Sequence, residues 1–331
     1  MSLLKIEDVA YVRFRAPDLG EMRGFLDDFG LTVVEATATR LVARGAGPSP
    51  VAHVTELGDA GFAGVAFRAG GLADLERLAA AEGAAIEKLD LPGGGSVVPL
   101  RDPDGHRVEV VAGQAPADPL PIAAAQAWNR EGAHARLRAT KRIAAGPASV
   151  VRLGHVVLNV SNFRASEQWY KERLGFITSD EIRLSPEFAL GAFLRCDRGD
   201  QPTDHHTLFL MQGRKGPSFN HAAYEVADLD DLMRGHQRLR DAGRHAEWGV
   251  GRHILGSQVF DYWRDPWGHT LEHWTDGDLF TAADGSGIAT VQDLLVSSGD
   301  PRHRRPWAER TSDEACHLRR RRRPAAGGRD R

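Results

Sequence analysis

The chain has 331 residues, of which 42% are hydrophobic, 26% charged and 7% aromatic, a composition typical of a globular protein with about two domains. No apolar run reaches the roughly 18 residues that a membrane-spanning helix needs, and the N-terminus lacks the pattern of a signal peptide. Two cysteines, Cys196 and Cys316, are too few for a disulfide framework. These features argue against a secreted protein that is stabilised by disulfides. They predict a cytoplasmic protein without a membrane partner.

The net charge of −3 is distributed unevenly along the chain. Residues 302–331 hold eleven arginines against four acidic residues, a net charge of +7 that leaves −10 for the rest. Nucleic-acid binding needs a basic face on the folded part, so the acidic body predicts no such partner. The arginine run at 319–323 could bind RNA or anionic lipid, but such a run is more often a solvated tail. We therefore expect disorder from about residue 300.

An internal repeat is the most informative feature of the sequence. Residues 10–31 align without a gap with residues 155–176, and each segment reads as an apolar strand, a polar turn and an amphipathic helix. A glycine, Gly30 or Gly175, stands where each helix should end. Two further blocks match in the same order: 62–75 with 219–232, and 102–111 with 265–274.

These matched blocks predict an α+β fold of two domains, each made of paired βαβββ units curled into an open barrel. We expect an N-terminal domain at 1–115, a connector at 116–150, a C-terminal domain at 151–285 and an extension at 286–331. Residues 122–142 of the connector have a composition compatible with a helix. Side chains alternate along a strand, so residues on several strands can converge inside each barrel.

The two halves differ at positions where chemistry is possible. Two histidines of the C-terminal half are absent from the first half, whereas a glutamate is shared; the aligned pairs are His155 with Ala10, His221 with Gly64, and Glu272 with Glu109. A single strand histidine is more often a core or surface residue than a ligand. Two imidazoles and a carboxylate, however, form the triad that suits Fe(II), sometimes Mn(II), and leaves coordination positions open. The C-terminal domain is therefore predicted to bind a metal.

Further polar residues follow in the same half. Residues 204–210 read DHHTLFL, and strand alternation would turn one of the two histidines inwards. His253 and Tyr262 precede the glutamate. They read either as polar surface residues or as groups around the metal, where a histidine can act as acid/base and a tyrosine can donate to substrate oxygens. Five aromatic residues could line a pocket or belong to the core: Phe188, Phe193, Trp248, Trp263 and Trp274.

Over residues 6–280 the sequence resembles the type I extradiol ring-cleaving dioxygenases of the vicinal oxygen chelate superfamily, in particular the two-domain catechol 2,3-dioxygenase and 2,3-dihydroxybiphenyl 1,2-dioxygenase group. The motif that carries the resemblance is G-x-H … Y-x-x-D-P-x-G-x-x-x-E, at Gly251, His253, Tyr262, Asp265, Pro266, Gly268 and Glu272. Asp261 departs from the apolar residue that many relatives have there, and it could tilt Tyr262 or change the polarity of the pocket.

The resemblance implies that His155, His221 and Glu272 bind Fe(II), with Mn(II) as the alternative. It also implies that His206 is the acid/base. His205 is the alternative by one register step, because such a shift turns a strand residue to the other face of the sheet.

The resemblance further implies that His253 and Tyr262 contact the oxygens of a catechol-type substrate, which is cleaved beside its diol by O2 in the degradation of aromatic compounds. A homo-oligomer is expected, because exposed strand edges in this fold often pair between subunits.

Two other interpretations remain open at this stage. A glyoxalase-like or fosfomycin-resistance-like enzyme would share the fold, but such relatives use different ligands and lack an equivalent of the pair His253 and Tyr262. A metal-free protein that sequesters small molecules is disfavoured by the presence of all three ligand residues.

Overall fold

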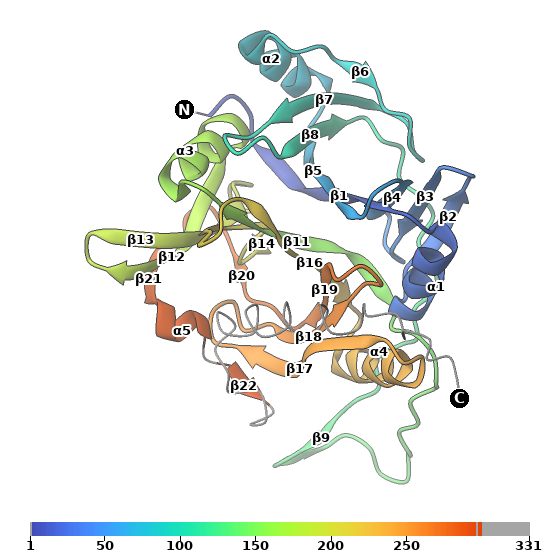
Figure 1. Cartoon of the computed structure of the whole chain (residues 1–331). Coiled ribbons are helices and arrows are strands. Elements are labelled where there is room, and N and C mark those ends of the chain that lie inside the picture. The colour runs from blue at the N-terminus through green and yellow to red at the C-terminus, as the bar shows by residue number, and fades with distance from the viewer. Residues whose placement is uncertain (1, 296, 300–331) are drawn as a thin grey trace, which may run out of the picture.

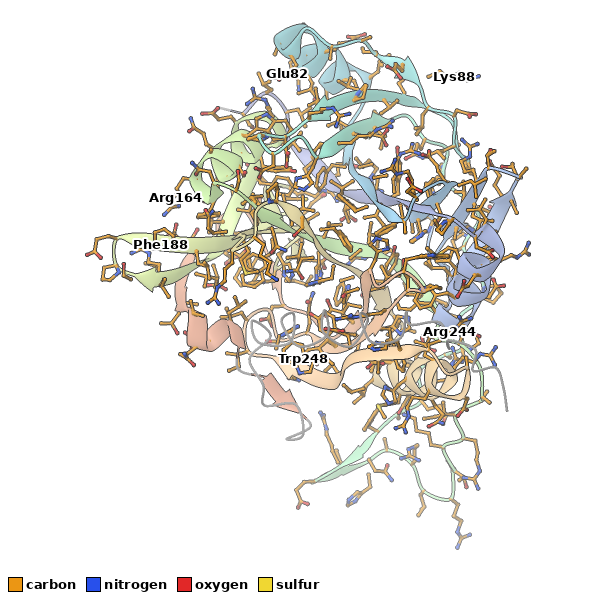
Figure 2. All side chains as sticks on the ribbon, in the orientation of Figure 1. Glu82, Lys88, Arg164, Phe188, Arg244 and Trp248 are labelled. Carbon is orange, nitrogen blue, oxygen red and sulfur yellow. The ribbon has the colours of Figure 1, made fainter. Side chains whose placement is uncertain are left out.

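Two large mixed sheets dominate the computed structural model, which describes residues 2–295 and 297–299. Figure 1 shows one sheet built from the first third of the chain and the other from the later part, each curling around its own interior. Side chains fill the interiors and the space between the sheets (Figure 2). The predicted two-part α+β architecture is therefore present, while the predicted domain boundaries stay a prediction.

The N-terminal sheet has eight strands in the order β2-β3-β4-β1-β5-β8-β7-β6. Its strands and helices are β1 (Ile6–Ala16), α1 (Leu19–Phe29), β2 (Thr32–Ala36), β3 (Arg40–Arg44), β4 (His53–Leu57), β5 (Gly61–Ala69), α2 (Leu72–Glu82), β6 (Glu87–Lys88), β7 (Ser96–Arg101) and β8 (Arg107–Ala112).

The C-terminal sheet has ten strands in the order β21-β12-β13-β15-β11-β16-β19-β18-β17-β22, and β14 pairs separately with β20. The elements of this half are β11 (Val150–Val160), α3 (Phe163–Leu174), β12 (Phe176–Ser185), β13 (Phe188–Cys196), β14 (Thr203–Asp204), β15 (Leu208–Gln212), β16 (Ser218–Val226), α4 (Leu229–Asp241), β17 (His245–His253), β18 (Val259–Arg264), β19 (Thr270–Thr275), β20 (Leu279–Phe280), β21 (Gly287–Thr290), α5 (Val291–Leu295) and β22 (Ser297–Gly299).

The first helices of the two halves end at the predicted glycines. The side chains of Asp18 and Asn162 cap α1 and α3 by accepting from backbone N–H groups three residues on. Gly30 and Gly175 end them with φ of 98° and 73°, a left-handed conformation that glycine adopts without steric cost. However, α1 has 11 residues and α3 has 12, so the two halves do not align without a gap.

The gap corrects the predicted partner of His155. Tyr11 pairs with Ala66 across β1 and β5, in the same way that His155 pairs with Ala223 across β11 and β16. The residue of the first half that corresponds to His155 is therefore Tyr11 and not Ala10.

The two halves pack closely against each other. Helix α1 of the first half contacts the second sheet, where Phe29 lies edge-on to Tyr224 with ring centroids 5.5 Å apart. In the reciprocal arrangement, Tyr170 of α3 lies 6.4 Å from Phe67 of the first sheet. One hydrophobic cluster contains buried residues from both halves, so the two sheets share a core.

The connector contains no helix, and the helix predicted for residues 122–142 is wrong. Its regular structure is a short hairpin of β9 (Asn129–Arg130) and β10 (Ala133–His134), which projects from the body in Figure 1. Between residues 121 and 145, all side chains except those of Arg136 and Lys141 are exposed. A helix of that length is marginal in water without a packed face, and the connector has no such face.

Several sequence expectations concern the end of the chain. The predicted disorder from about residue 300, the arginine run and Cys316 lie outside the described residues.

Cys196 is a buried free thiol. None of the described helices is long and apolar enough to cross a membrane.

Candidate metal centre

Three neighbouring strands bring His155, His221 and Glu272 together. Ala223 of β16 is the register partner both of His155 on β11 and of Glu272 on β19. His221 lies two residues before Ala223 and so points to the same face of the sheet. The alanine side chain is small, which leaves room above it for the two imidazoles and the carboxylate.

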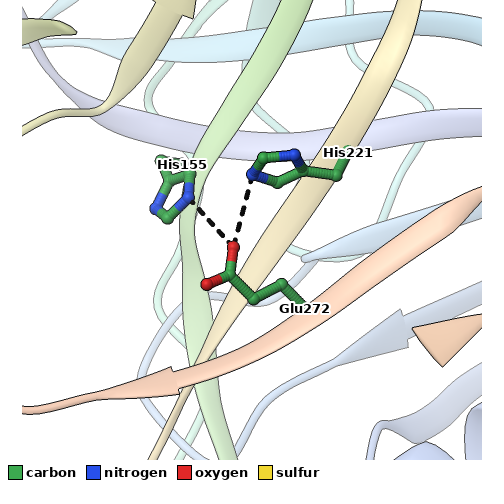
Figure 3. Close-up of side chains that lie close together, drawn as sticks. All are labelled: His155, His221 and Glu272. Atoms are coloured by element: carbon green, nitrogen blue, oxygen red, sulfur yellow. Dashed lines mark ion pairs between the residues drawn. The ribbon is translucent and has the colours of Figure 1, made fainter. Parts of the chain in front are cut away.

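The donor atoms of these side chains are close enough for one ion. Oε2 of Glu272 lies 3.4 Å from Nε2 of His155 and 3.3 Å from Nε2 of His221, as Figure 3 shows. One potential ligand atom from each residue lies within 4.8 Å of the others. Among the described residues, no other group of three His, Cys, Asp or Glu side chains converges in this way.

The surroundings of Glu272 favour a cation beside its carboxylate. The residue is fully buried, yet neither carboxylate oxygen has a hydrogen-bond partner. Burial alone would raise the pKa of Glu272, but the rings of His155 and His221 hold it below its usual range. A buried, unpaired carboxylate is costly unless a cation compensates it. Two imidazole nitrogens and a carboxylate oxygen fit a divalent transition metal with open positions.

His206 lies beside the three ligand residues, and His205 lies behind it. The ring of His206 is 4.1 Å from that of His155, centroid to centroid. His205 donates from Nε2 to Oδ2 of Asp180 at 2.7 Å, and its Nδ1 lies 3.1 Å from Nδ1 of His206. Burial, followed by the neighbouring histidines, holds the pKa of His206 well below the ordinary value. His206 is thus an uncharged imidazole that can accept a proton.

His253 and Tyr262 face the ligand residues from β17 and β18. Nε2 of His253 lies 3.0 Å from the hydroxyl of Tyr262 and 3.8 Å from Oε1 of Glu272. Tyr262 is the register partner of Glu272, and its ring stands edge-on to His221 at 5.2 Å. Burial lowers the pKa of His253 to about 4 and raises that of Tyr262 well above its usual value. Both groups are therefore neutral hydrogen-bonding groups at neutral pH.

Asp261, the departure from the family motif, points away from this site. Its Oδ2 accepts from Nε1 of Trp263 at 2.5 Å and lies 3.1 Å from Nδ1 of His236 on α4. Successive strand residues face opposite sides of a sheet, so Asp261 lies across the sheet from Tyr262. The expected effects on the tilt of Tyr262 and on pocket polarity therefore have no direct structural basis.

The predicted aromatic residues separate into two groups. Phe193, Trp248 and Trp274 surround the site, with ring centroids 4.8 Å from His206, 5.6 Å from Tyr262 and 6.1 Å from His155, respectively. The other two lie elsewhere: Trp263 is buried on the helix side of the sheet, and Phe188 is exposed.

Sequence reasoning missed Phe260 and Asn220. The ring of Phe260 is 4.1 Å from that of His253, and it shares the inner face of β18 with Tyr262 two residues on. Period-two alternation from Tyr262 would have found it. Nδ1 of His221 lies 2.9 Å from the side-chain oxygen of Asn220, a contact for which the sequence holds no signal.

The equivalent place in the first half contains a different arrangement. Oε2 of Glu109 accepts from the hydroxyl of Tyr11 at 2.7 Å and from Nε of Arg13 at 2.8 Å, and Arg107 also binds the carboxylate. Gly64, which corresponds to His221, contributes no side chain. Two guanidiniums therefore compensate this buried carboxylate, and no histidine lies beside it among the described residues of the first half.

Comparisons with known proteins agree with this geometry. Residues 152–273 match the model of the Glyoxalase/Bleomycin resistance protein/Dioxygenase superfamily. The chain is 31% identical to Metapyrocatechase 2 of Cupriavidus necator. The alignment spans 301 residues and covers 89% of each chain. The chain belongs to the extradiol dioxygenases of this superfamily. The family predicted from the sequence is thus confirmed, and so is the class of enzyme, an extradiol catechol dioxygenase.

Two more distant similarities bear on the metal and the fold. The Manganese-dependent 2,3-dihydroxybiphenyl 1,2-dioxygenase of Geobacillus genomosp. 3 is 29% identical over 140 residues, 41% of this chain and 43% of that protein. The Mn(II)-bound glyoxalase of Novosphingobium aromaticivorans superposes with a TM-score of 0.73 and 23% identity, over 90% of this chain and 94% of the other. This likeness confirms the predicted fold. The family and the donor set together indicate a divalent metal, iron or manganese.

Proposed function

We propose that this dioxygenase binds Fe(II) through His155, His221 and Glu272 and cleaves a catechol-type ring beside its diol. The observation that carries the assignment is the buried Glu272, whose oxygens lack hydrogen bonds and whose Oε2 lies 3.3–3.4 Å from Nε2 of His155 and of His221. A bound Fe(II) would supply open positions for the diol and for O2, and redox chemistry between them.

The protein side chains would bind the substrate and move its protons. The neutral Tyr262 and His253 can hydrogen-bond to the diol oxygens and fix the orientation of the ring. The aromatic walls formed by Phe193, Trp248 and Trp274 suit a flat apolar substrate and help to exclude water.

His206 would be the acid/base of the reaction. Its Nδ1–H can donate to Nδ1 of His205, whose Nε2–H donates to Asp180. This order leaves Nε2 of His206 to accept a proton from the substrate and later return it. His205, turned towards Asp180, would orient His206.

Mn(II) is the alternative metal, because the same donor set accepts it and a relative is named as manganese-dependent. The first half, with Arg13 beside Glu109, would support the catalytic half without binding metal. The cytoplasmic location and the homo-oligomer expected from the sequence stay predictions.

Oxygen uptake by anaerobically loaded protein tests this assignment. Separate Fe(II)- and Mn(II)-loaded samples are offered catechol, 3- and 4-methylcatechol, 2,3-dihydroxybiphenyl and a trihydroxybenzene, and the ring-opened product is followed by its visible absorbance. We expect oxygen consumption with a yellow product from the Fe(II) sample. Higher turnover with Mn(II) would reassign the metal. No uptake with any diol, despite one bound metal per chain, would contradict the proposed reaction.

A further inference from the structure

Asn220 occupies an irregular position immediately before His221. In the pairing of β11 with β16, Val157 is opposite His221 and Leu158 is opposite Phe219, so Asn220 is the extra residue of a β-bulge. A bulge bends the strand locally and can re-aim a side chain. Here the amide of Asn220 lies beside the ring of His221, with Oδ1 at 2.9 Å from Nδ1.

A chain of hydrogen bonds leads to this contact. Nδ2 of Asn159 donates to the hydroxyl of Ser218 at 2.9 Å, which turns Oδ1 of Asn159 towards Asn220. Nδ2 of Asn220 donates to that oxygen at 3.3 Å. Oδ1 of Asn220 is therefore the atom that faces His221, and an amide oxygen can only accept. The partner of this oxygen is therefore the Nδ1–H of His221, and a metal at the site would take the lone pair of Nε2.

The direction matters because Nε2 is the atom that faces Glu272, at 3.3 Å from Oε2. A histidine ligand binds a metal through an unprotonated nitrogen, and a partner on the other nitrogen fixes both the tautomer and the ring orientation. His155 has no such partner, because its Nδ1 is buried without a hydrogen bond. The two histidines are therefore held by different means: His155 by packing, and His221 by an amide.

The first half provides an internal comparison. The same bulge occurs there, between Arg13 opposite Gly64 and Phe14 opposite Phe62, and its extra residue is Ala63. The bulge therefore forms without an asparagine. A polar residue stands at the bulge only in the half where the next residue is a histidine.

We propose that Asn220 is a positioning residue that holds His221 in the Nδ1–H tautomer, with Nε2 directed to the metal, and that Asn159 in turn orients Asn220. The inference rests on the proposed role of His221 as a ligand. It adds a residue that does not itself touch the metal or the substrate.

Metal affinity without turnover provides the first test. Fe(II) binding is measured anaerobically by competition with a chelator for the wild type, Asn220→Ala and Asn220→Asp. We expect Asn220→Ala to bind about 10- to 100-fold more weakly. Asn220→Asp should stay close to the wild type, because a carboxylate also accepts from Nδ1–H and the Asn159 amide can turn to donate to it. Gln212→Ala, which removes an amide on β15 of the same sheet, is the matched control and should bind like the wild type.

The Nδ1–H of His221 provides the second test. In the Zn(II)-loaded protein with ¹⁵N-labelled histidine, this proton should exchange slowly with solvent in the wild type and in Asn220→Asp, and fast in Asn220→Ala. The signal is assigned by its loss in His221→Gln. Affinity of Asn220→Ala within about twofold of the wild type, or unchanged exchange of this proton in that variant, would overturn the inference. If His221→Ala itself binds Fe(II) as well as the wild type, the proposed metal site fails as well.

Discussion

Glu109 and Glu272 occupy the same position in the two sheets, each in register with an alanine of the neighbouring strand, Ala66 and Ala223. Both carboxylates are buried. Arg13 and Tyr11 bind Glu109, whereas two imidazoles surround Glu272. The repeat thus places a buried negative charge twice, and the two halves differ in what compensates it.

The first prediction concerns the guanidinium in the metal-free half. Arg13→Met should lower the free energy of unfolding by about 1–3 kcal/mol, because it removes the buried one of the two guanidiniums that bind Glu109 and leaves only the more exposed Arg107. Urea unfolding of the apo-protein measures this change. Adding Glu109→Gln to Arg13→Met should recover part of the loss, since the second change removes a buried charge that has lost its buried partner. A single variant as stable as the wild type would contradict this account of the first half.

The second prediction separates the two adjacent histidines. His206→Ala should retain iron and lose about 10²- to 10⁴-fold in kcat, because the neutral acid/base beside the ligands is removed. His205→Ala should lose less, because His205 acts through the orientation of His206. Stopped-flow assays and iron content of the purified variants give the measurement. Unchanged turnover in His206→Ala would point to His205 or to neither.

The sequence predicted the metal site because duplication supplied a comparison within one chain. His221 and Glu272 were matched with their true counterparts, Gly64 and Glu109. His155 was matched one residue away from its counterpart, Tyr11, because α3 is one residue longer than α1 and an ungapped alignment cannot place that residue. Because His155 was matched with Ala10, the sequence comparison did not reveal that Tyr11 binds Glu109 in the first half.

Other features could not be read from the sequence, for physical reasons. Strand alternation could not choose between His205 and His206, since β14 ends at Asp204 and β15 begins at Leu208, so neither histidine lies in a strand. The bulge at Asn220 depends on the register between two strands that are distant in the chain. The connector has helix-forming residues, but propensity alone does not stabilise a helix that packs on nothing.

The third prediction concerns metal binding and stability. Fe(II) at about 100 times its dissociation constant should stabilise the wild type by about 2.7 kcal/mol, because the ion binds the folded state. His221→Ala should retain no iron and show no such gain, while its apo form unfolds close to the wild-type apo-protein, since the ring is partly exposed and is not part of the hydrophobic core. Thermal unfolding under anaerobic conditions, with and without Fe(II), checks both statements. Equal metal-dependent shifts in the two proteins would remove His221 from the ligand set.

The fourth prediction concerns pH and the contact between the halves. His53 on β4 is fully buried, with Nδ1 3.0 Å from the hydroxyl of Tyr224 and Nε2 2.9 Å from that of Thr55. Burial lowers its pKa from 6.5 to about 4. Between these two values the unfolded chain binds a proton that the folded chain does not, so the stability from this group is complete above pH 6.5 and falls as the pH drops towards 4.

Replacing His53 by glutamine should flatten this dependence. Glutamine keeps a donor and an acceptor for the hydroxyls of Tyr224 and Thr55 but does not titrate. The unfolding free energy of His53→Gln should therefore fall less steeply with decreasing pH than that of the wild type. The two slopes should differ by up to about 1.4 kcal/mol per pH unit. Urea unfolding of the apo-proteins between pH 4 and 8 measures both slopes with metal excluded. Because the other histidines are present in both proteins, identical slopes would show that His53 has no lowered pKa in the folded state.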